Sequence, residues 1–155
     1  MGLAELLDIR PGVTAVIGGG GKTTLLRILG EELAAKGARV LLCATTKIFP
    51  FPDLENRTNP SEEALEKALA SRRLLCAGTP VPGTGKLTAP GIPMDRLAAL
   101  ADYVLAEADG SAGRPLKAHA PHEPVIPPEA NQTVCVVGAA GFGLPIARAA
   151  HRPGL

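Results

Sequence analysis

Short apolar runs alternate along the chain with longer segments in which apolar and polar positions recur at helical spacing. A run such as Val40–Ala44 is apolar at every position, which is typical of a parallel strand covered on both faces. Strands are predicted at residues 13–17, 40–44, 74–77, 103–106 and 133–137. Helices are predicted at residues 3–9, 23–36, 60–70 and 94–101. This alternation predicts an α/β fold with a mostly parallel sheet and helices on both faces.

Proline, glycine and small polar residues mark where these elements begin and end. The sequence Asn59-Pro60-Ser61-Glu62 predicts a capping box that places Pro60 at the first helical position. The Pro- and Gly-rich residues 78–93 predict a hairpin in which residues 86–88 return. Residues 110–128 are rich in Pro and His and are predicted to form an ordered functional loop.

The most informative motif is the run Gly18-Gly19-Gly20-Gly21-Lys22-Thr23-Thr24, between the predicted strand 13–17 and the predicted helix 23–36. A strand, a glycine turn, Lys-Thr and a helix are the parts of a phosphate-binding loop. Glycine amides and the helix N-terminus would bind phosphate, Lys22 would reach the terminal phosphates, and Thr23 would ligate Mg²⁺. The first glycine of the standard motif would fall on Val16, so this loop is a short form. It makes the predicted fold a P-loop-type three-layer sandwich.

Two carboxylates follow the predicted strand 103–106, at the sheet edge where ligands bind in such folds. Glu107 and Asp109 share one strand face and can enter one pocket. We expect one of them to hold Mg²⁺ with Thr23 while the other orients water or substrate. The predicted catalytic residues are therefore Lys22, Glu107 and Asp109. A solvated strand end followed by an Asp-Gly turn is the alternative interpretation.

Other polar residues carry weaker signals. Thr45 and Thr46 are predicted to offer hydroxyls to metal or phosphate, although β-branched residues are also good strand formers. Lys47 is a candidate for binding a substrate anion. His119 and His122 suit an ordinary loop better than a metal pair. Arg114 is the nearest candidate for an arginine finger. Lys117, three residues later, has little support as a functional residue by itself.

Composition narrows the function further. A chain of 155 residues with 46% apolar and 20% charged residues predicts one globular domain. With a net charge of +1 and no Trp, the sequence shows neither a basic patch nor aromatic residues for stacking on bases, so a nucleic-acid-binding surface is not evident. No apolar run is long enough to cross a membrane. The N-terminus lacks the features of a signal peptide. Three widely spaced cysteines in apolar runs predict buried thiols, no metal site formed by cysteine thiolates, and a cytoplasmic protein.

The chain resembles the selenium-dependent hydroxylase accessory proteins of the YqeC type. The resemblance covers nearly the whole chain, and it is carried by Gly18–Thr24, Ala44–Lys47, Glu107–Ser111, the diagnostic run Gly113–Pro127, and Val136–Gly138. It implies a P-loop-type nucleotide-binding protein that assists maturation of selenium-dependent molybdenum hydroxylases. Family members usually continue past the position of His151, so we expect residues 1–155 to form one P-loop-like domain that lacks the family's C-terminal part. The glycine loop alone is also similar to that of the Mur ligases.

These observations lead to three hypotheses. The first is an accessory protein that hydrolyses ATP or GTP with Mg²⁺, its hydrolysis controlling delivery or an interaction with a partner; molybdenum hydroxylase subunits or cofactor-maturation proteins are the expected partners. The second is an ATP-dependent small-molecule kinase or ligase. The third is a non-catalytic module that binds a nucleotide or a molybdopterin. Neither nucleic acid nor a membrane is an expected partner.

Overall fold

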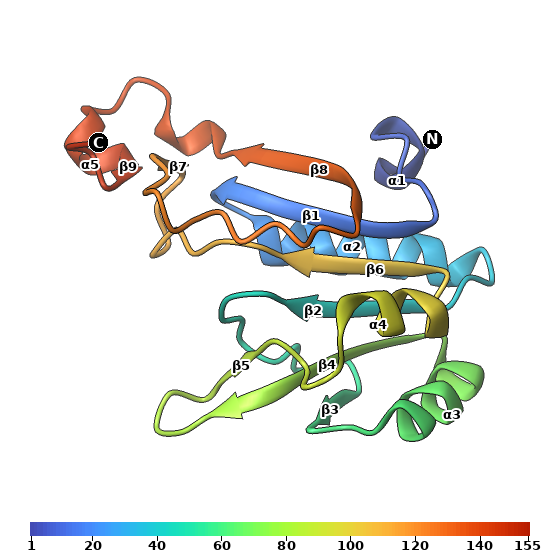
Figure 1. Cartoon of the computed structure of the whole chain (residues 1–155). Coiled ribbons are helices and arrows are strands. Elements are labelled where there is room, and N and C mark those ends of the chain that lie inside the picture. The colour runs from blue at the N-terminus through green and yellow to red at the C-terminus, as the bar shows by residue number, and fades with distance from the viewer.

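A computed structural model describes residues 1–155 (Figure 1). In chain order its elements are α1 (Leu3–Leu6), β1 (Gly12–Gly19), α2 (Lys22–Ala35), β2 (Val40–Ala44), β3 (Asn56–Thr58), α3 (Glu62–Arg72), β4 (Leu74–Val81), β5 (Lys86–Thr88), α4 (Met94–Leu100), β6 (Tyr103–Glu107), β7 (Leu116–Lys117), β8 (Ala130–Val137), the 3₁₀ turn η1 (Ala139–Gly141), α5 (Ile146–Ala149) and β9 (Ala150–His151).

The main sheet has seven strands, six of them in the order β3-β4-β2-β6-β1-β8, and β5 pairs with β4. Every pair is parallel except β4 with β5, which forms the predicted hairpin. The prediction of a mostly parallel α/β sheet is confirmed. Because β1 and β6 are parallel neighbours, with Val16 opposite Glu107, the residues that follow the two strands emerge side by side.

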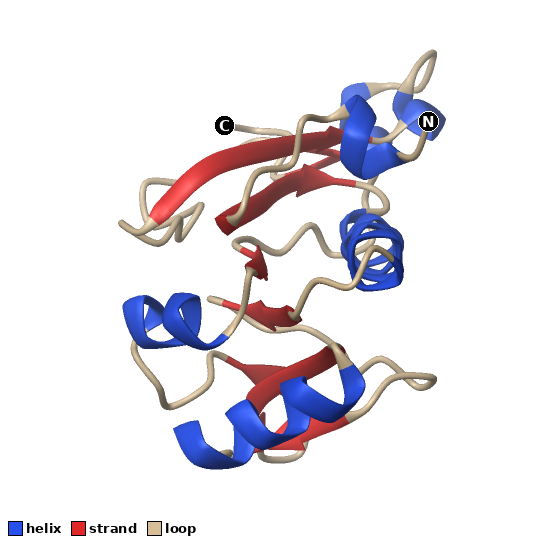
Figure 2. Cartoon of the chain, turned by 90° about the vertical axis from the view of Figure 1, so that its right-hand side faces the viewer, coloured by secondary structure: helices blue, strands red, loops and turns tan.

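Helices cover both faces of the sheet, as predicted (Figure 2). One buried cluster joins α1 and α2 to the sheet, and a second joins α3 and α4 to the opposite face. Helix α2 buries Leu26, Leu29 and Leu33 along one side, which follows from their helical spacing. All five residues of β2 are buried, since helices pack on both of its faces. None of the helices combines the length and the apolar character needed to cross a membrane.

Several predicted boundaries differ from the observed ones, and two of the differences have a clear structural cause. The first strand does not end at Ile17 but continues through Gly19, because β8 pairs with both of its final glycines. Helix α3 does not begin at Pro60. Its N-cap is Ser61, whose hydroxyl accepts a hydrogen bond from the Ala64 amide at 3.2 Å.

Some short strands have no clear signal in the sequence. The proline-rich segment after Lys47 contains β3, which pairs with β4. The predicted loop 110–128 contains β7, which pairs with β9 near the end of the chain. This pairing brings the C-terminal segment back beside the loop, beyond the ends of β1 and β8 (Figure 1).

The cysteine prediction is confirmed for two of the three thiols. Cys43 and Cys76 are buried, and burial raises the pKa of each thiol to about 12. Cys135 is exposed, so the prediction is wrong there. The reason is that β8 lies at the edge of the sheet and alternates half-buried and exposed positions.

Candidate functional site

The glycine segment connects β1 to α2 in a sharp turn. Gly21 is the N-cap of α2 and has a φ of 93°, a conformation that favours glycine because other residues carry a Cβ. A side chain at Gly18 would collide with the Val136 carbonyl of β8. Glycine therefore lets the end of β1, the start of α2 and the neighbouring strand approach one another closely.

The turn presents a row of unpaired backbone donors. The amides from Gly20 to Thr24 donate no hydrogen bond within the chain, and Leu25 is the first whose amide does, to the Gly21 carbonyl at 2.9 Å. These donors lie at the positive end of the α2 dipole. An anion placed against the turn would satisfy them together.

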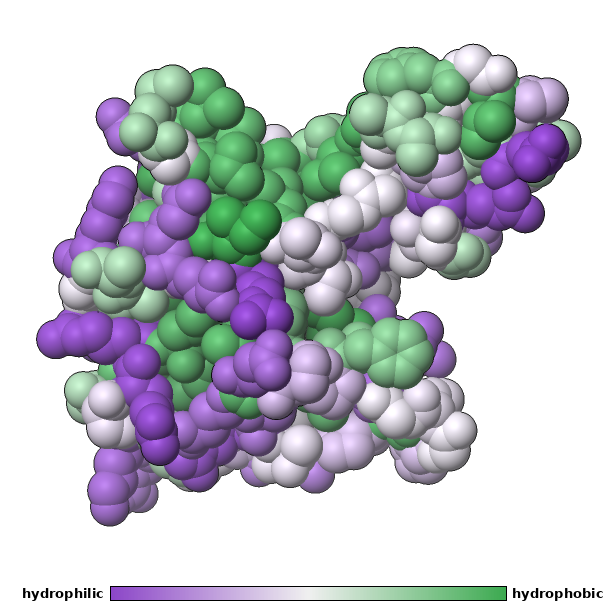
Figure 3. Space-filling view, turned by 180° about the vertical axis from the view of Figure 1, so that it is seen from behind, coloured by the Kyte–Doolittle hydropathy of each residue, from purple (hydrophilic) through white to green (hydrophobic).

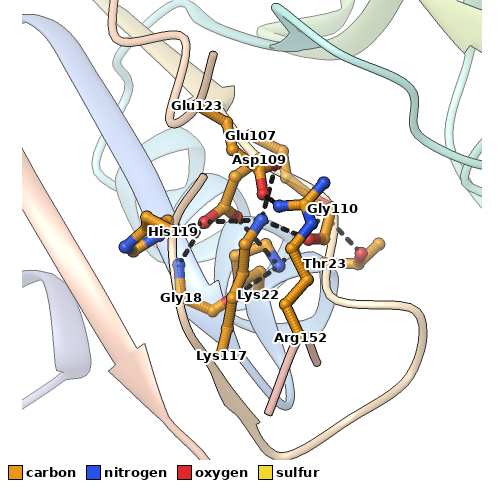
Figure 4. A network of polar contacts seen from close by, with 10 residues as sticks. All are labelled: Gly18, Lys22, Thr23, Glu107, Asp109, Gly110, Lys117, His119, Glu123 and Arg152. Atoms are coloured by element: carbon orange, nitrogen blue, oxygen red, sulfur yellow. Dashed lines mark hydrogen bonds and ion pairs between the residues drawn. The ribbon is translucent and has the colours of Figure 1, made fainter. Parts of the chain in front are cut away.

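Lys22 brings the three predicted catalytic residues together (Figure 4). Its side chain is only 3% exposed. The ammonium donates to the Gly18 carbonyl at 2.8 Å, lies 3.2 Å from Asp109 Oδ1 and lies 3.9 Å from Glu107 Oε1. The parallel pairing of β1 and β6 explains this convergence, since Glu107 ends β6 and Asp109 follows it by two residues.

Glu107 is the last residue of β6 and faces the start of α2. The Thr23 hydroxyl donates a hydrogen bond to Glu107 Oε2 at 2.9 Å. Burial raises the pKa of Glu107, and the Lys22 charge and the Thr23 hydrogen bond offset this effect only in part. A cation beside this carboxylate would therefore favour its ionised form.

Asp109 joins the end of β1 to the segment 110–128. Its side chain is fully buried, and Oδ2 accepts a hydrogen bond from the Gly18 amide at 2.8 Å and lies 2.8 Å from His119 Nε2. Burial by itself would raise the pKa of Asp109. The Gly18 and His119 hydrogen bonds and the Lys22 charge outweigh burial, so the pKa lies below its ordinary value.

Lys117 is a buried cation at the same centre, and sequence reasoning missed its role. Its fully buried ammonium lies 2.7 Å from Glu123 Oε2 and 3.5 Å from Asp109 Oδ2, and it donates to the Gly110 carbonyl. Burial lowers the pKa of Lys117, and the Asp109 charge opposes this. Glu123 also pairs with Arg152 from the C-terminal segment. The available sequence signal was the position of Lys117 within the diagnostic run 113–127.

Several predicted residues lie outside this centre. The Thr45 hydroxyl donates to the Val125 carbonyl at 2.7 Å, and the Thr46 hydroxyl is buried without a hydrogen-bond partner. Neither residue lines the polar cavity that opens at the glycine turn. The Arg114 guanidinium donates to the Arg148 carbonyl.

The two predicted loop histidines have different neighbours. His119 contacts Asp109, whereas His122 Nε2 lies 3.4 Å from Arg152 Nη2. The two imidazoles therefore have separate partners in the fold. His119 is instead a neighbour of the carboxylate that holds the glycine turn.

A polar cavity of about 520 Å³ opens at the glycine turn. The space-filling view shows the molecule deeply notched on the side where the sheet strands end (Figure 3). The lining residues come from three regions. The first is the glycine turn and the start of α2 (Gly20–Thr24), the second is Lys47–Phe49 together with Lys86 of β5, and the third is Glu107 with Gly110–Gly113. A second cavity, of about 290 Å³ and mostly apolar, adjoins Gly18 and Gly19 on the side of β8.

The donor set at the polar cavity fits Mg²⁺ bound together with phosphate. Thr23 and Glu107 supply adjacent hard oxygens, the type of ligand that Mg²⁺ prefers. Mg²⁺ commonly takes only one or two protein ligands and completes its shell with phosphate and water. A dedicated protein cage is therefore not required.

Comparisons with known proteins identify one family. A family model described as YqeC protein matches residues 14–154. The chain is 36% identical over 141 residues to a protein of Escherichia coli (strain K12) named "Uncharacterized protein YqeC", an alignment that covers 86% of this chain and 54% of that relative. The chain thus spans about half the length of the curated relative. No solved structure matches the chain.

Proposed function

The chain belongs to the YqeC family, and from this premise we propose that it binds a nucleoside triphosphate with Mg²⁺ and hydrolyses it. The observation that carries the proposal is the row of unpaired amides from Gly20 to Thr24, beside Lys22 and the Thr23–Glu107 pair. These groups supply the donors, the cation and the metal ligands that phosphoryl transfer requires.

Charge neutralisation and positioning would do most of the chemical work. The free amides would bind the β- and γ-phosphate oxygens, and the Lys22 ammonium would turn from the Gly18 carbonyl toward them. Thr23 and Glu107 would hold Mg²⁺, which as a Lewis acid polarises the phosphoryl oxygens.

Asp109 acts in this proposal as a positioning residue. Its side chain is fully buried, does not line the polar cavity and is already engaged with Gly18, Lys22 and His119. Glu107 does line the cavity and is next to Thr23. We therefore assign metal binding to Glu107. The role assigned to Asp109 is to hold Gly18 and Lys22 in their orientations.

Calorimetry on the full natural protein tests nucleotide binding. MgATP and MgGTP are titrated into the wild type, Lys22→Ala and Lys36→Ala, the last a lysine at the opposite end of α2. One nucleotide should bind to the wild type and to Lys36→Ala, and Lys22→Ala should weaken binding by about tenfold or more, or about 1.4 kcal/mol. No binding to the wild type, or equal binding to Lys22→Ala, would refute the proposal.

Thr23→Val provides a second variant in which no buried charge is removed. It should retain the fold, measured by circular dichroism, but should lose the Mg²⁺ dependence of nucleotide affinity. Phosphate release is then measured with the bound nucleotide. Binding without turnover would leave a nucleotide-binding module and reject the hydrolase.

We also propose that hydrolysis serves the maturation of selenium-dependent molybdenum hydroxylases. This role is the one implied by the resemblance to the selenium-dependent hydroxylase accessory proteins, and the YqeC family model matches residues 14–154. The full natural protein is tested for capture of purified molybdenum hydroxylase subunits, with a non-hydrolysable MgATP analogue and with MgADP. Capture should differ between the two nucleotides and be lost in Lys22→Ala. Equal or absent capture under both conditions would contradict this role.

A further inference from the structure

We propose that the cavity wall formed by Lys47, Phe49 and Lys86 binds a second anion, a small molecule with several phosphate or carboxylate oxygens, next to the nucleotide. This inference rests on the proposed nucleotide site, because it assigns the part of the same cavity that the glycine turn does not form. The second anion would be either a substrate of the nucleotide-dependent reaction or a ligand that controls it.

The wall is held by backbone pairing between two distant segments. Ile48 and Leu87 exchange two amide–carbonyl hydrogen bonds, each of 2.8 Å. The Thr88 hydroxyl adds a hydrogen bond of 2.7 Å to the Thr46 carbonyl. The cavity wall is thus built on a strand-like bridge between the end of the β2 region and the β4–β5 hairpin.

Side chains that alternate along the two extended segments of the wall point in turn to the core and to the cavity. Ile48 and Leu87 are buried in the core, each only 3% exposed. Their immediate neighbours must point to the opposite side in an extended chain. Lys47, Phe49 and Lys86 are three of these four neighbours, and all three line the polar cavity. The fourth, Thr88, instead donates its hydroxyl to the Thr46 carbonyl.

The two lysines of the wall carry unneutralised charge. Neither Lys47 nor Lys86 forms an ion pair within the chain, whereas Lys22 is near both Glu107 and Asp109. The Lys86 ammonium lies 4.6 Å from the centre of the Phe49 ring. This cation–π contact orients the ammonium and leaves its charge available to a ligand.

The lining of the cavity favours an anion over a nucleobase at this wall. Three lysines and one carboxylate line the cavity, while its apolar lining consists of Ile48, Phe49 and Ala112. A base site is normally built from apolar surface with few charges. A neutral base here would desolvate two ammonium groups without pairing them, which is costly. A ligand with several anionic oxygens would pair with both.

The test uses the full natural protein saturated with Mg²⁺ and a non-hydrolysable ATP analogue. Pyrophosphate and citrate are titrated separately by calorimetry, as probes for phosphate-bearing and carboxylate-bearing anions. At least one should bind at a single additional site. Lys47→Gln and Lys86→Gln should each weaken that binding by about tenfold, yet change the affinity for the nucleotide analogue by less than about threefold. Lys67→Gln, an exposed lysine of α3, is the matched control.

Two outcomes would overturn the inference. One is the absence of an additional site for either probe. The other is a tenfold loss of nucleotide affinity in the glutamine variants, which would make both lysines nucleotide ligands. Pyrophosphate is also titrated without nucleotide. A second equivalent of bound pyrophosphate that depends on Lys47 and Lys86 would support the wall even if nucleotide binding fails, whereas a single equivalent that depends on Lys22 alone would reject it.

Discussion

The Gly18 amide donates a hydrogen bond of 2.8 Å to Asp109 Oδ2, although the two residues are 91 positions apart in the chain. This contact joins the end of β1 to the segment that follows β6. The same carboxylate faces the Lys22 ammonium at 3.2 Å through its other oxygen. One buried carboxylate therefore holds both the glycine turn and the lysine of the turn in place.

Asp109→Asn should destabilise the protein and weaken nucleotide binding. Removing one partner of a buried ion pair costs about 3 kcal/mol, because the remaining charge loses its compensation. The pKa of Asp109 is lowered in the folded state, so its stabilisation is present above the unfolded value and is lost as pH falls through the folded pKa. Urea denaturation from pH 2 to 7 should show a wild-type advantage that disappears at acid pH. Asp95→Asn, at an exposed position of α4, should not change this pH dependence.

Glu107→Gln should separate stability from metal binding. The pKa of Glu107 is raised by burial, so the folded state retains the proton longer than the unfolded state, and wild-type stability falls as pH rises from the unfolded to the folded value. Without metal, Glu107→Gln should therefore be at least as stable as the wild type at neutral pH. Its affinity for Mg-nucleotide should fall by about tenfold. Denaturation and calorimetry check these opposite signs, and a variant that loses stability but binds Mg-nucleotide normally would contradict both.

Lys117→Met should destabilise the protein, because it removes the buried ammonium that pairs with Glu123 and Asp109. Methionine fills a similar volume but leaves two carboxylates with one fewer cation, so a loss of about 3 kcal/mol in unfolding free energy is expected. Lys67→Met, on the exposed face of α3, should change stability by less than about 0.5 kcal/mol. Equal stability of the two variants in chemical denaturation would show that the buried network adds nothing.

Alkylation should distinguish the three cysteines in the folded protein. At pH 8, N-ethylmaleimide should modify Cys135, which is exposed, and spare Cys43 and Cys76, whose burial raises the thiol pKa to about 12. Intact mass and peptide mapping should show one adduct, and three after denaturation. Native adducts on Cys43 or Cys76 would contradict the packing of β2 and β4.

The fold and the glycine turn are largely encoded in local patterns. Apolar runs such as Val40–Ala44 and the spacing of Leu26, Leu29 and Leu33 identify strands and helices, because burial depends on periodicity that is visible in a short window. The motif Gly18–Thr24 lies in a continuous segment, so its chemistry can also be predicted. Placing Glu107 beside it needed only the rule that parallel strands present their carboxyl ends at one edge.

Other parts of the site arise from contacts between distant segments. Whether Thr45 or Lys47 would line the cavity depended on the bridge between Ile48 and Leu87, and the pairing of Lys117 with Glu123 and Asp109 depended on the path of residues 110–128. Cys135 is exposed because β8 lies at a sheet edge, although its local sequence is that of a buried strand. Local sequence sets which conformation a segment prefers. The partner of a buried charge is decided by packing across the whole chain, because an unpaired buried charge is costly and its partner can come from any segment that the fold brings near.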